Sequence, residues 1–249
     1  MSEKTLFLAW QDKKPGRAWF PVGQLDADVD HSMYRFRYIK GVRKAKKEGF
    51  TPLLDFPELK GDYRSSELFP LFRNRVMNPA RPDFSEYLQS LDLPEKANPI
   101  EILERNGGTR VTDTYEVFPK LTKHEDGSFT CRFFLHGWRY TNEEAKARLN
   151  ELVEDEALYV TLELNNPATR LAVQIQTVDY HMIGWAPRYL VHDLTRAMAD
   201  SRGKYEAKVA RLNSDTVISK QRVLIEMRGY WDKHEPMSSN DYQLLVPQK

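Results

Sequence analysis

The sequence predicts an α+β protein with two dissimilar parts: a mixed α/β segment over residues 1–123 and a strand-rich segment over residues 124–249. Two observations predict this division. In the first part, apolar runs with a period of two alternate with several short runs that have helical spacing. In the second part most apolar runs alternate and few helices interrupt them, which is typical of a small β-barrel. The polar residues around Asp126-Gly127 have the composition of a linker or a hairpin turn.

Composition limits the possible functions. The 249 residues include 37 Lys and Arg and 36 Asp and Glu, so the formal net charge is only +1. A nucleic-acid site must therefore be a local patch, because no bulk positive field is present. The single cysteine, Cys131, cannot form an internal disulfide, and we expect no metal and no cofactor. No apolar run approaches the roughly 20 residues of a membrane span, so we expect a cytoplasmic protein without membrane contact.

The strands of the first part are predicted from alternation. Residues 5–10 and 18–22 form a hairpin around a turn at Pro15 and Gly16. Residues 34–39 alternate aromatic side chains with arginines, which predicts a half-buried strand with the arginines opposite the rings. A further strand is expected at residues 115–118.

Four helical segments are expected between these strands. The basic run between Gly41 and Gly49 forms a short helix or an exposed loop. Residues 65–77 form a helix that Ser65 caps and that tolerates Pro70 in its first turns. The remaining two segments are residues 84–91 and residues 99–106, the latter stopped by Gly107-Gly108.

The second part is predicted to contain mostly strands. A capping box at Thr141 and Glu144 starts one helix, and a second covers residues 189–198 and ends near Gly203. An Asn-Asn-Pro turn joins two of the strands. The expected strands are residues 129–135, 158–164, 171–177, 182–185, 205–212 and 222–230.

Enzyme signatures are absent from the sequence. It contains no phosphate-binding glycine loop, no G-x-S-x-G and no H-E-x-x-H. Cys131 and His136 are five positions apart on one predicted strand, so their side chains point to opposite faces and cannot act as a nucleophile and its base. We therefore expect a protein that is not an enzyme.

Aromatic and basic residues occur together at two predicted strand ends. Trp138, Arg139 and Tyr140 follow Gly137 directly, and Trp185 precedes Arg188 by three positions. An aromatic ring can stack on a base while a guanidinium binds a phosphate, so both groups are candidate nucleic-acid contacts. The alternative is that Trp138 and Tyr140 belong to the barrel core and Arg139 lies in solvent.

Three segments of the second part resemble the HIRAN domain in their order and spacing: FFLHGWRY at 133–140, NNPATRLAV at 165–173 and MIGWAPRYL at 182–190. The resemblance covers residues 129–232. It implies an OB-like small β-barrel that binds single-stranded DNA and grips a free 3′ end.

The resemblance implies roles for individual residues. Arg139 and Tyr140 match a DNA-contacting segment of the family, and Arg188 matches a phosphate contact. The implied nucleic-acid site comprises Trp138, Arg139, Tyr140, Trp185, Arg188, Asn166 and Thr169. The sequence departs from the family where an aromatic residue and an aspartate normally contact the terminal nucleotide, because Ala168 and Thr169 stand there.

Residues 5–121 resemble the N-terminal subdomain of HipA-type toxin kinases, through YRFRY, PLLDFPEL, ELFPLFRNRVM and PIEILERNGG. No kinase core follows. The resemblance therefore implies a protein-binding module without ATP site or kinase activity.

Together these features predict a non-catalytic bacterial DNA-binding adaptor, in which the barrel binds single-stranded DNA or DNA 3′ ends and residues 1–123 bind a protein partner in repair, mobile-element or defence processes. One alternative is an antitoxin-like interaction subunit that binds no DNA, and another is an enzyme such as a nuclease. A possible basic patch extends the DNA path or is simply a solvated face; it consists of Arg43, Lys44, Lys46 and Lys47.

Overall fold

The computed structural model describes residues 3–14, 18–110, 112–201, 205–214 and 219–246. The chain forms two compact units. The first consists of Met1–Gln89, Leu93–Lys120 and Met237–Lys249, and the second of Ser90–Asp92 and Leu121–Pro236. These units differ from the division at residue 123 mainly at the C-terminus, because the segment after Pro236 groups with the first unit.

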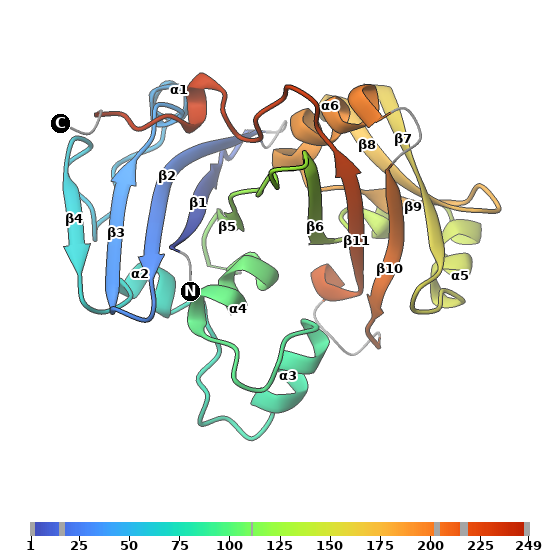
Figure 1. Cartoon of the computed structure of the whole chain (residues 1–249), viewed down its shortest axis with the longest axis horizontal. Helices are drawn as coiled ribbons and strands as arrows, with labels where there is room; N and C mark the ends of the chain where they lie inside the picture. Colours follow the sequence, from blue (N-terminus) through green and yellow to red (C-terminus); the bar gives the residue numbers. More distant parts are fainter. Residues whose placement is uncertain (1–2, 15–17, 111, 202–204, 215–218, 247–249) are drawn as a thin grey trace. The chain divides into compact units, whose positions relative to one another are not determined.

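The first unit is built on an antiparallel sheet with the strand order β4-β3-β2-β1-β5 (Figure 1). The pairing of β1 with β2 confirms the predicted hairpin, although the turn expected at Pro15 and Gly16 lies outside the described residues. Its strands are β1 (Lys4–Gln11), β2 (Trp19–Asp28), β3 (Met33–Tyr38), β4 (Asp62–Ser65) and β5 (Tyr115–Pro119).

Aromatic side chains dominate the core of the first unit. The rings of Phe36 and Phe56 stack with centroids 3.9 Å apart, and the Tyr38 hydroxyl donates to the Phe56 carbonyl at 2.7 Å. The prediction of a half-buried strand at residues 34–39 is wrong at Arg37. Its guanidinium is buried and pairs with Asp26 at 2.5 Å, because the neighbouring strand β2 supplies a carboxylate on the face opposite the rings.

The helices of the first unit are short: α1 (Val42–Lys47), α2 (Pro70–Arg73), α3 (Phe84–Ser90) and α4 (Pro99–Asn106). The expected helix over residues 65–77 is wrong, since Ser65 ends strand β4 and α2 begins at Pro70. Proline lacks an N–H and fits the first position of a helix, which explains this start. Helix α4 ends as predicted, at Gly107 in the left-handed conformation (φ +71°).

The second unit contains an antiparallel sheet with the strand order β6-β11-β10-β7-β8-β9. The described strands do not form a closed barrel, so the OB-like barrel expectation is not confirmed. The strands are β6 (Ser128–Phe134), β7 (Ala157–Asn166), β8 (Arg170–Thr177), β9 (Met182–Trp185), β10 (Glu206–Leu212) and β11 (Val223–Tyr230).

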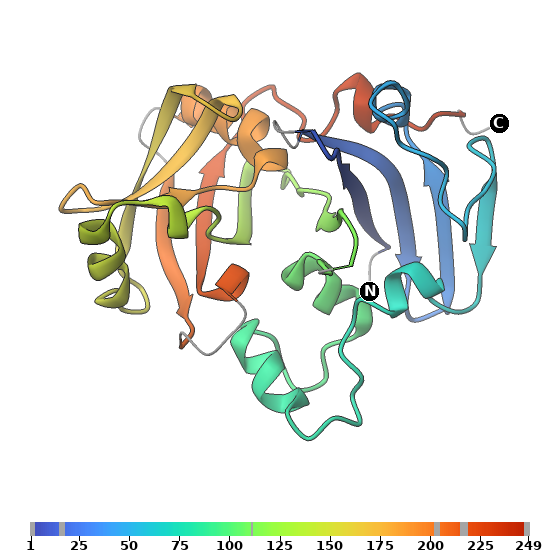
Figure 2. The same ribbon diagram turned by 180° about the vertical axis from the view of Figure 1, so that it is seen from behind.

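Two α-helices and short 3₁₀ segments accompany this sheet. Figure 2 shows the yellow-green segment with η1 (Trp138–Tyr140) and α5 (Glu143–Asn150) in front of the sheet. Asn142, and not Thr141, caps α5 by accepting from the Ala145 amide at 2.8 Å, because the Thr141 hydroxyl donates instead to the Trp138 carbonyl at 2.7 Å.

The core of the second unit lies against helix α6 (Val191–Ser201), which follows η2 (Arg188–Leu190). Phe129 and Trp231 stack with ring centroids 3.9 Å apart, and the Trp231 indole donates to the Asp193 carbonyl of α6 at 2.9 Å. The expected end of this helix near Gly203 lies outside the described residues. Among the described helices, none is long and apolar enough to span a bilayer.

Candidate nucleic-acid interface

The segment after β6 is joined to strand β9 by a single β-bridge. The His136 amide donates to the Trp185 carbonyl at 2.9 Å, and the Trp185 amide donates back to the His136 carbonyl at 2.9 Å. These two bonds place the turn that begins at Gly137 beside the end of β9. The two aromatic-basic groups identified in the sequence are thereby brought together.

Two glycines make this close approach possible. Gly137 has φ +71°, and a Cβ on it would lie 2.6 Å from the ring of Trp185. A Cβ on Gly184 would lie 2.6 Å from the His136 carbonyl oxygen. Real Cβ atoms do not tolerate such distances, so both positions need glycine. The Trp185 ring therefore lies directly against the backbone of Gly137.

The three side chains of segment η1 differ in their exposure to solvent. Tyr140 is 84% exposed and Arg139 is exposed, whereas Trp138 is half-buried. The Tyr140 amide donates to the Gly137 carbonyl at 2.8 Å, which holds the segment in a tight turn. The alternative in which Tyr140 is a core residue is therefore wrong.

Glu163 links Trp185 to the turn between β7 and β8. Its Oε2 atom accepts from the Trp185 indole at 2.7 Å and from the Asn166 side-chain amide at 2.9 Å. The hydrogen bond from Asn166, followed by that from Trp185, lowers the pKa of Glu163 despite the opposing effect of burial. Glu163 was not among the predicted residues, because only the strand register brings it to Trp185.

Asn166 and Thr169 form the turn itself. The Asn166 Oδ1 atom accepts from the Thr169 amide at 3.0 Å and from the Thr169 hydroxyl at 2.9 Å. This arrangement is a side-chain-stabilised turn of the kind that asparagine favours. Asn166 thus connects the turn to Trp185 through Glu163, whereas Thr169 bonds to Asn166 within the turn.

Two cations, Lys220 and Arg188, influence the protonation of His136 at its bridge to Trp185. Burial is the main cause that lowers the pKa of His136 to about 4, and the positive charges of Lys220 and Arg188 act in the same direction. Both cations therefore disfavour a positive charge on the His136 ring. Lys220, in segment η3 (Ser219–Gln221), was missed from the sequence because nothing local marks it.

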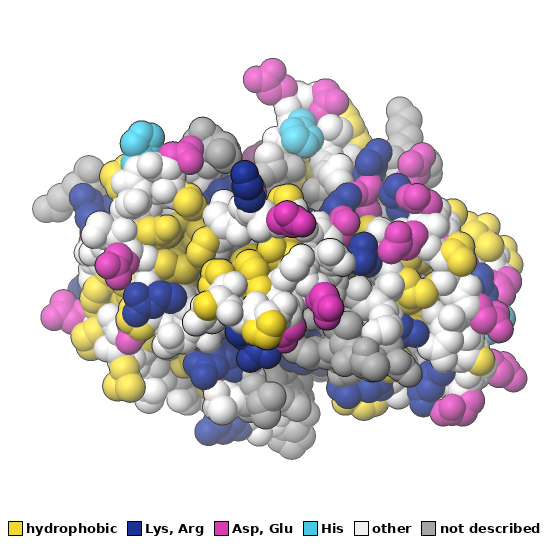
Figure 3. All heavy atoms as spheres, turned by 90° about the horizontal axis from the view of Figure 1, so that it is seen from below, with side chains coloured by type: hydrophobic (Ala, Val, Ile, Leu, Met, Phe, Trp, Pro, Cys, Tyr) yellow, Lys and Arg dark blue, Asp and Glu magenta, His cyan; other side chains and the backbone are white. Residues whose placement is uncertain are grey.

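The predicted basic patch belongs to the first unit. Its four side chains on α1 are exposed, and the Lys44 ammonium pairs with Asp241 at 2.6 Å. On the face drawn in Figure 3, basic and acidic side chains are interspersed. Charge density alone therefore does not mark a nucleic-acid surface.

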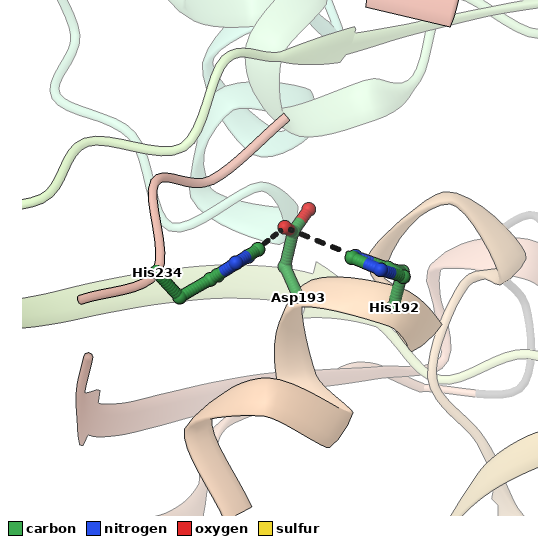
Figure 4. Close-up of side chains that lie close together, drawn as sticks. All are labelled: His192, Asp193 and His234. Atoms are coloured by element: carbon green, nitrogen blue, oxygen red, sulfur yellow. Dashed lines mark hydrogen bonds and ion pairs between the residues drawn. The ribbon is translucent and has the colours of Figure 1, made fainter. Parts of the chain in front are cut away.

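One other cluster offers metal-ligand atoms among the described residues: His192, Asp193 and His234 (Figure 4). Cys131 belongs to no such cluster among the residues that the structure describes. Its side chain is buried, and burial raises the pKa of its thiol to about 12.

Comparison with known proteins supports the resemblance in the second unit. Residues 128–231 match the family model of the HIRAN domain. A search of curated proteins by sequence found no match.

Two similar solved structures were found. A crystal structure of a protein from Lactobacillus plantarum is 19% identical with a TM-score of 0.34, covering 43% of this chain and 100% of its own. The HIRAN domain of human HLTF is 17% identical with a TM-score of 0.33, covering 44% of this chain and 84% of its own. It is the family match that identifies residues 128–231 of this chain as a HIRAN domain.

Proposed function

We propose that this protein is a non-catalytic DNA-binding adaptor whose HIRAN domain binds single-stranded DNA or DNA ends at the turn Gly137–Tyr140. The observation that carries the proposal is the exposed Arg139-Tyr140 pair, held beside Trp185 by the bridge from His136. HIRAN domain homologues bind DNA, which supports the same role here.

The aromatic residues take different parts in this proposal. Tyr140, at 84% exposure, offers a ring on which a base stacks. Trp185 is half-buried, lies against Gly137 and donates its indole N–H to Glu163. Trp185 therefore acts as a positioning residue that supports the turn, and Tyr140 provides the stacking surface.

The basic residues supply the phosphate contacts. Arg139 lies next to Tyr140, and Arg188 and Lys220 act on the same His136. Each phosphate of a single strand that the protein neutralises contributes about −0.7 to the slope of log K against the logarithm of the salt concentration. Three contacts therefore correspond to a slope of roughly −2, which is a much weaker salt dependence than that of a highly basic DNA-binding protein.

Capture of a 3′ end depends on the turn between β7 and β8. Ala168 has no ring for stacking, and the Thr169 hydroxyl already donates to Asn166. We therefore expect binding along the strand, with equal affinity for oligonucleotides that end in a 3′-hydroxyl and in a 3′-phosphate. A clear preference for the 3′-hydroxyl would instead support end capture.

The direct test is fluorescence anisotropy with a labelled single strand. Arg139→Ala/Tyr140→Ala removes one charged contact and one stack of about 1–3 kcal/mol, so affinity is expected to fall by about 100-fold. Tyr180→Ala is the matched control, since Tyr180 is 75% exposed in the same unit and outside the proposed site. Equal affinity of the double variant and the wild type would remove this site.

One observation favours the alternative of an antitoxin-like interaction subunit. Leu162 and Leu164 are 40% and 70% exposed near the end of β7, and such apolar side chains suit a protein contact. Absence of any anisotropy change at low salt would favour that alternative. We also propose that residues 5–121 form a HipA-type module and that this module binds a protein partner.

A further inference from the structure

Two histidines and an aspartate from distant parts of the second unit meet at one point. His192 and Asp193 lie in the first turn of α6, and His234 follows the buried Trp231 after strand β11. Figure 4 shows the two imidazole rings approaching the Asp193 carboxylate from opposite sides. No metal site was expected from the sequence, because the chain has a single cysteine.

The three side chains have the spacing of metal ligands. The His234 Nε2 atom lies 2.6 Å from Asp193 Oδ1, and the His192 Nδ1 atom lies 3.8 Å from the same oxygen. All three ligand atoms lie within 4.8 Å of one another. Metal–nitrogen and metal–oxygen bonds of about 2.0–2.2 Å place ligand atoms about 3–4 Å apart, so small side-chain rotations accommodate an ion.

The backbone of this cluster is held by groups that are not ligands. The Trp231 indole donates to the Asp193 carbonyl at 2.9 Å. The Lys123 ammonium donates to the carbonyls of Asp232 and His234 at 2.8 and 3.2 Å. Both segments are thus positioned before any ion binds, which lowers the entropic cost of binding.

Two other His–Asp pairs provide an internal comparison. His31 lies 2.7 Å from Asp28, and His181 lies 3.1 Å from Asp179. Among the described residues, neither pair belongs to a group with a third potential ligand. Within the described part of the chain, only the cluster at the start of α6 combines a buried carboxylate with two imidazoles.

We propose that His192, Asp193 and His234 bind a divalent first-row transition-metal ion such as Zn²⁺. Imidazole nitrogens select such ions over Mg²⁺ and Ca²⁺, which prefer oxygen ligands. The side chain of His192 is 66% exposed, so the site opens to solvent. Three protein ligands leave a coordination position for water or another oxygen ligand.

Isothermal titration of the full-length, tag-free protein after treatment with a chelator tests the site. We expect saturable Zn²⁺ binding at one equivalent, no comparable Mg²⁺ binding, and a visible absorption band when Co²⁺ is added. His192→Ala is expected to weaken Zn²⁺ binding by more than about tenfold, because a ligand is lost. His181→Ala is the matched control and should bind as the wild type does.

A second variant keeps the test decisive if His192→Ala folds poorly. His234→Gln retains a polar side chain after Trp231 and should weaken Zn²⁺ binding as well, with circular dichroism confirming the fold of each variant. Absence of saturable Zn²⁺ binding to the wild type would overturn the proposal. Unchanged affinity in both ligand variants would do the same.

Discussion

Helix α1 and the turn Gly137–Tyr140 are the two regions that the sequence marks for DNA contact, and they differ in what accompanies the charge. Helix α1 carries four exposed cations, of which Lys44 pairs with Asp241. The turn carries one exposed arginine beside an exposed tyrosine and a supporting tryptophan. An exposed ring thus accompanies the cation at the turn, whereas the α1 run contains no ring and one of its cations is neutralised by Asp241. Under the proposed function, this difference favours the turn as the DNA contact.

The largest expected effect is on stability, and it differs between glycine-to-alanine variants in these two regions. Gly49, after α1, has φ +104° and no atom within 4 Å of an added Cβ, whereas Gly137 has φ +71° and the Trp185 ring at 2.6 Å. Gly137→Ala therefore adds a clash to the backbone strain and should lower the free energy of unfolding by about 2–4 kcal/mol.

Gly49→Ala adds only backbone strain and should lower the free energy of unfolding by about 1–2 kcal/mol. Urea unfolding of both variants measures the difference. Equal losses of stability would mean that the Trp185 ring moves aside and that the turn is not tightly packed.

A pH dependence is expected from His136, next to Gly137. The pKa of His136 is about 4 in the folded protein and about 6.5 in an unfolded chain. As the pH falls, the unfolded chain binds a proton at this histidine at a higher pH than the folded protein does. The contribution of neutral His136 to the free energy of unfolding is therefore complete above pH 6.5 and is lost as the pH falls toward 4. The loss amounts to roughly 3 kcal/mol at most.

His136→Gln removes this titration. Urea unfolding at pH 7 and pH 4.5 should therefore show a smaller loss of stability in the variant than in the wild type. Parallel losses in both proteins would show that His136 is hydrated and titrates normally in the folded state.

The smallest effect is expected at α1. Arg43→Ala/Lys46→Ala/Lys47→Ala removes exposed cations that have no exposed ring between them, so single-strand affinity should change by less than about threefold at physiological salt. The same anisotropy assay measures it, with Arg139→Ala/Tyr140→Ala beside it. A loss equal to that of the double variant would make α1 part of the DNA path and reverse the comparison.

Local patterns predicted many of the secondary-structure elements. The strand at residues 182–185, the helix at residues 99–106 and its stop at Gly107 were expected where the structure has them. Alternation and glycine conformation are properties of the chain itself, so they are visible without knowledge of its neighbours.

The errors arose where local signals competed. Pro70 started a helix that was expected from Ser65, and Asn142 capped a helix that was expected to begin at Thr141. In each case two nearby residues had suitable chemistry for a helix start. Proline at the first position began the first helix, and the bond from the Thr141 hydroxyl to Trp138 left Asn142 to cap the second. Arg37 lies opposite the rings as expected, but it is buried there, because Asp26 of the adjacent strand neutralises it.

The sequence by itself determined the aromatic-basic groups, the HIRAN resemblance and the alternation of the strands, because each depends on residues close together in the chain. Only the tertiary structure decided that Glu163 holds Trp185, 22 residues away, and that His234 meets Asp193, 41 residues away. Such pairs depend on strand register and helix packing. These arise from the burial of the whole core, and no short segment encodes them.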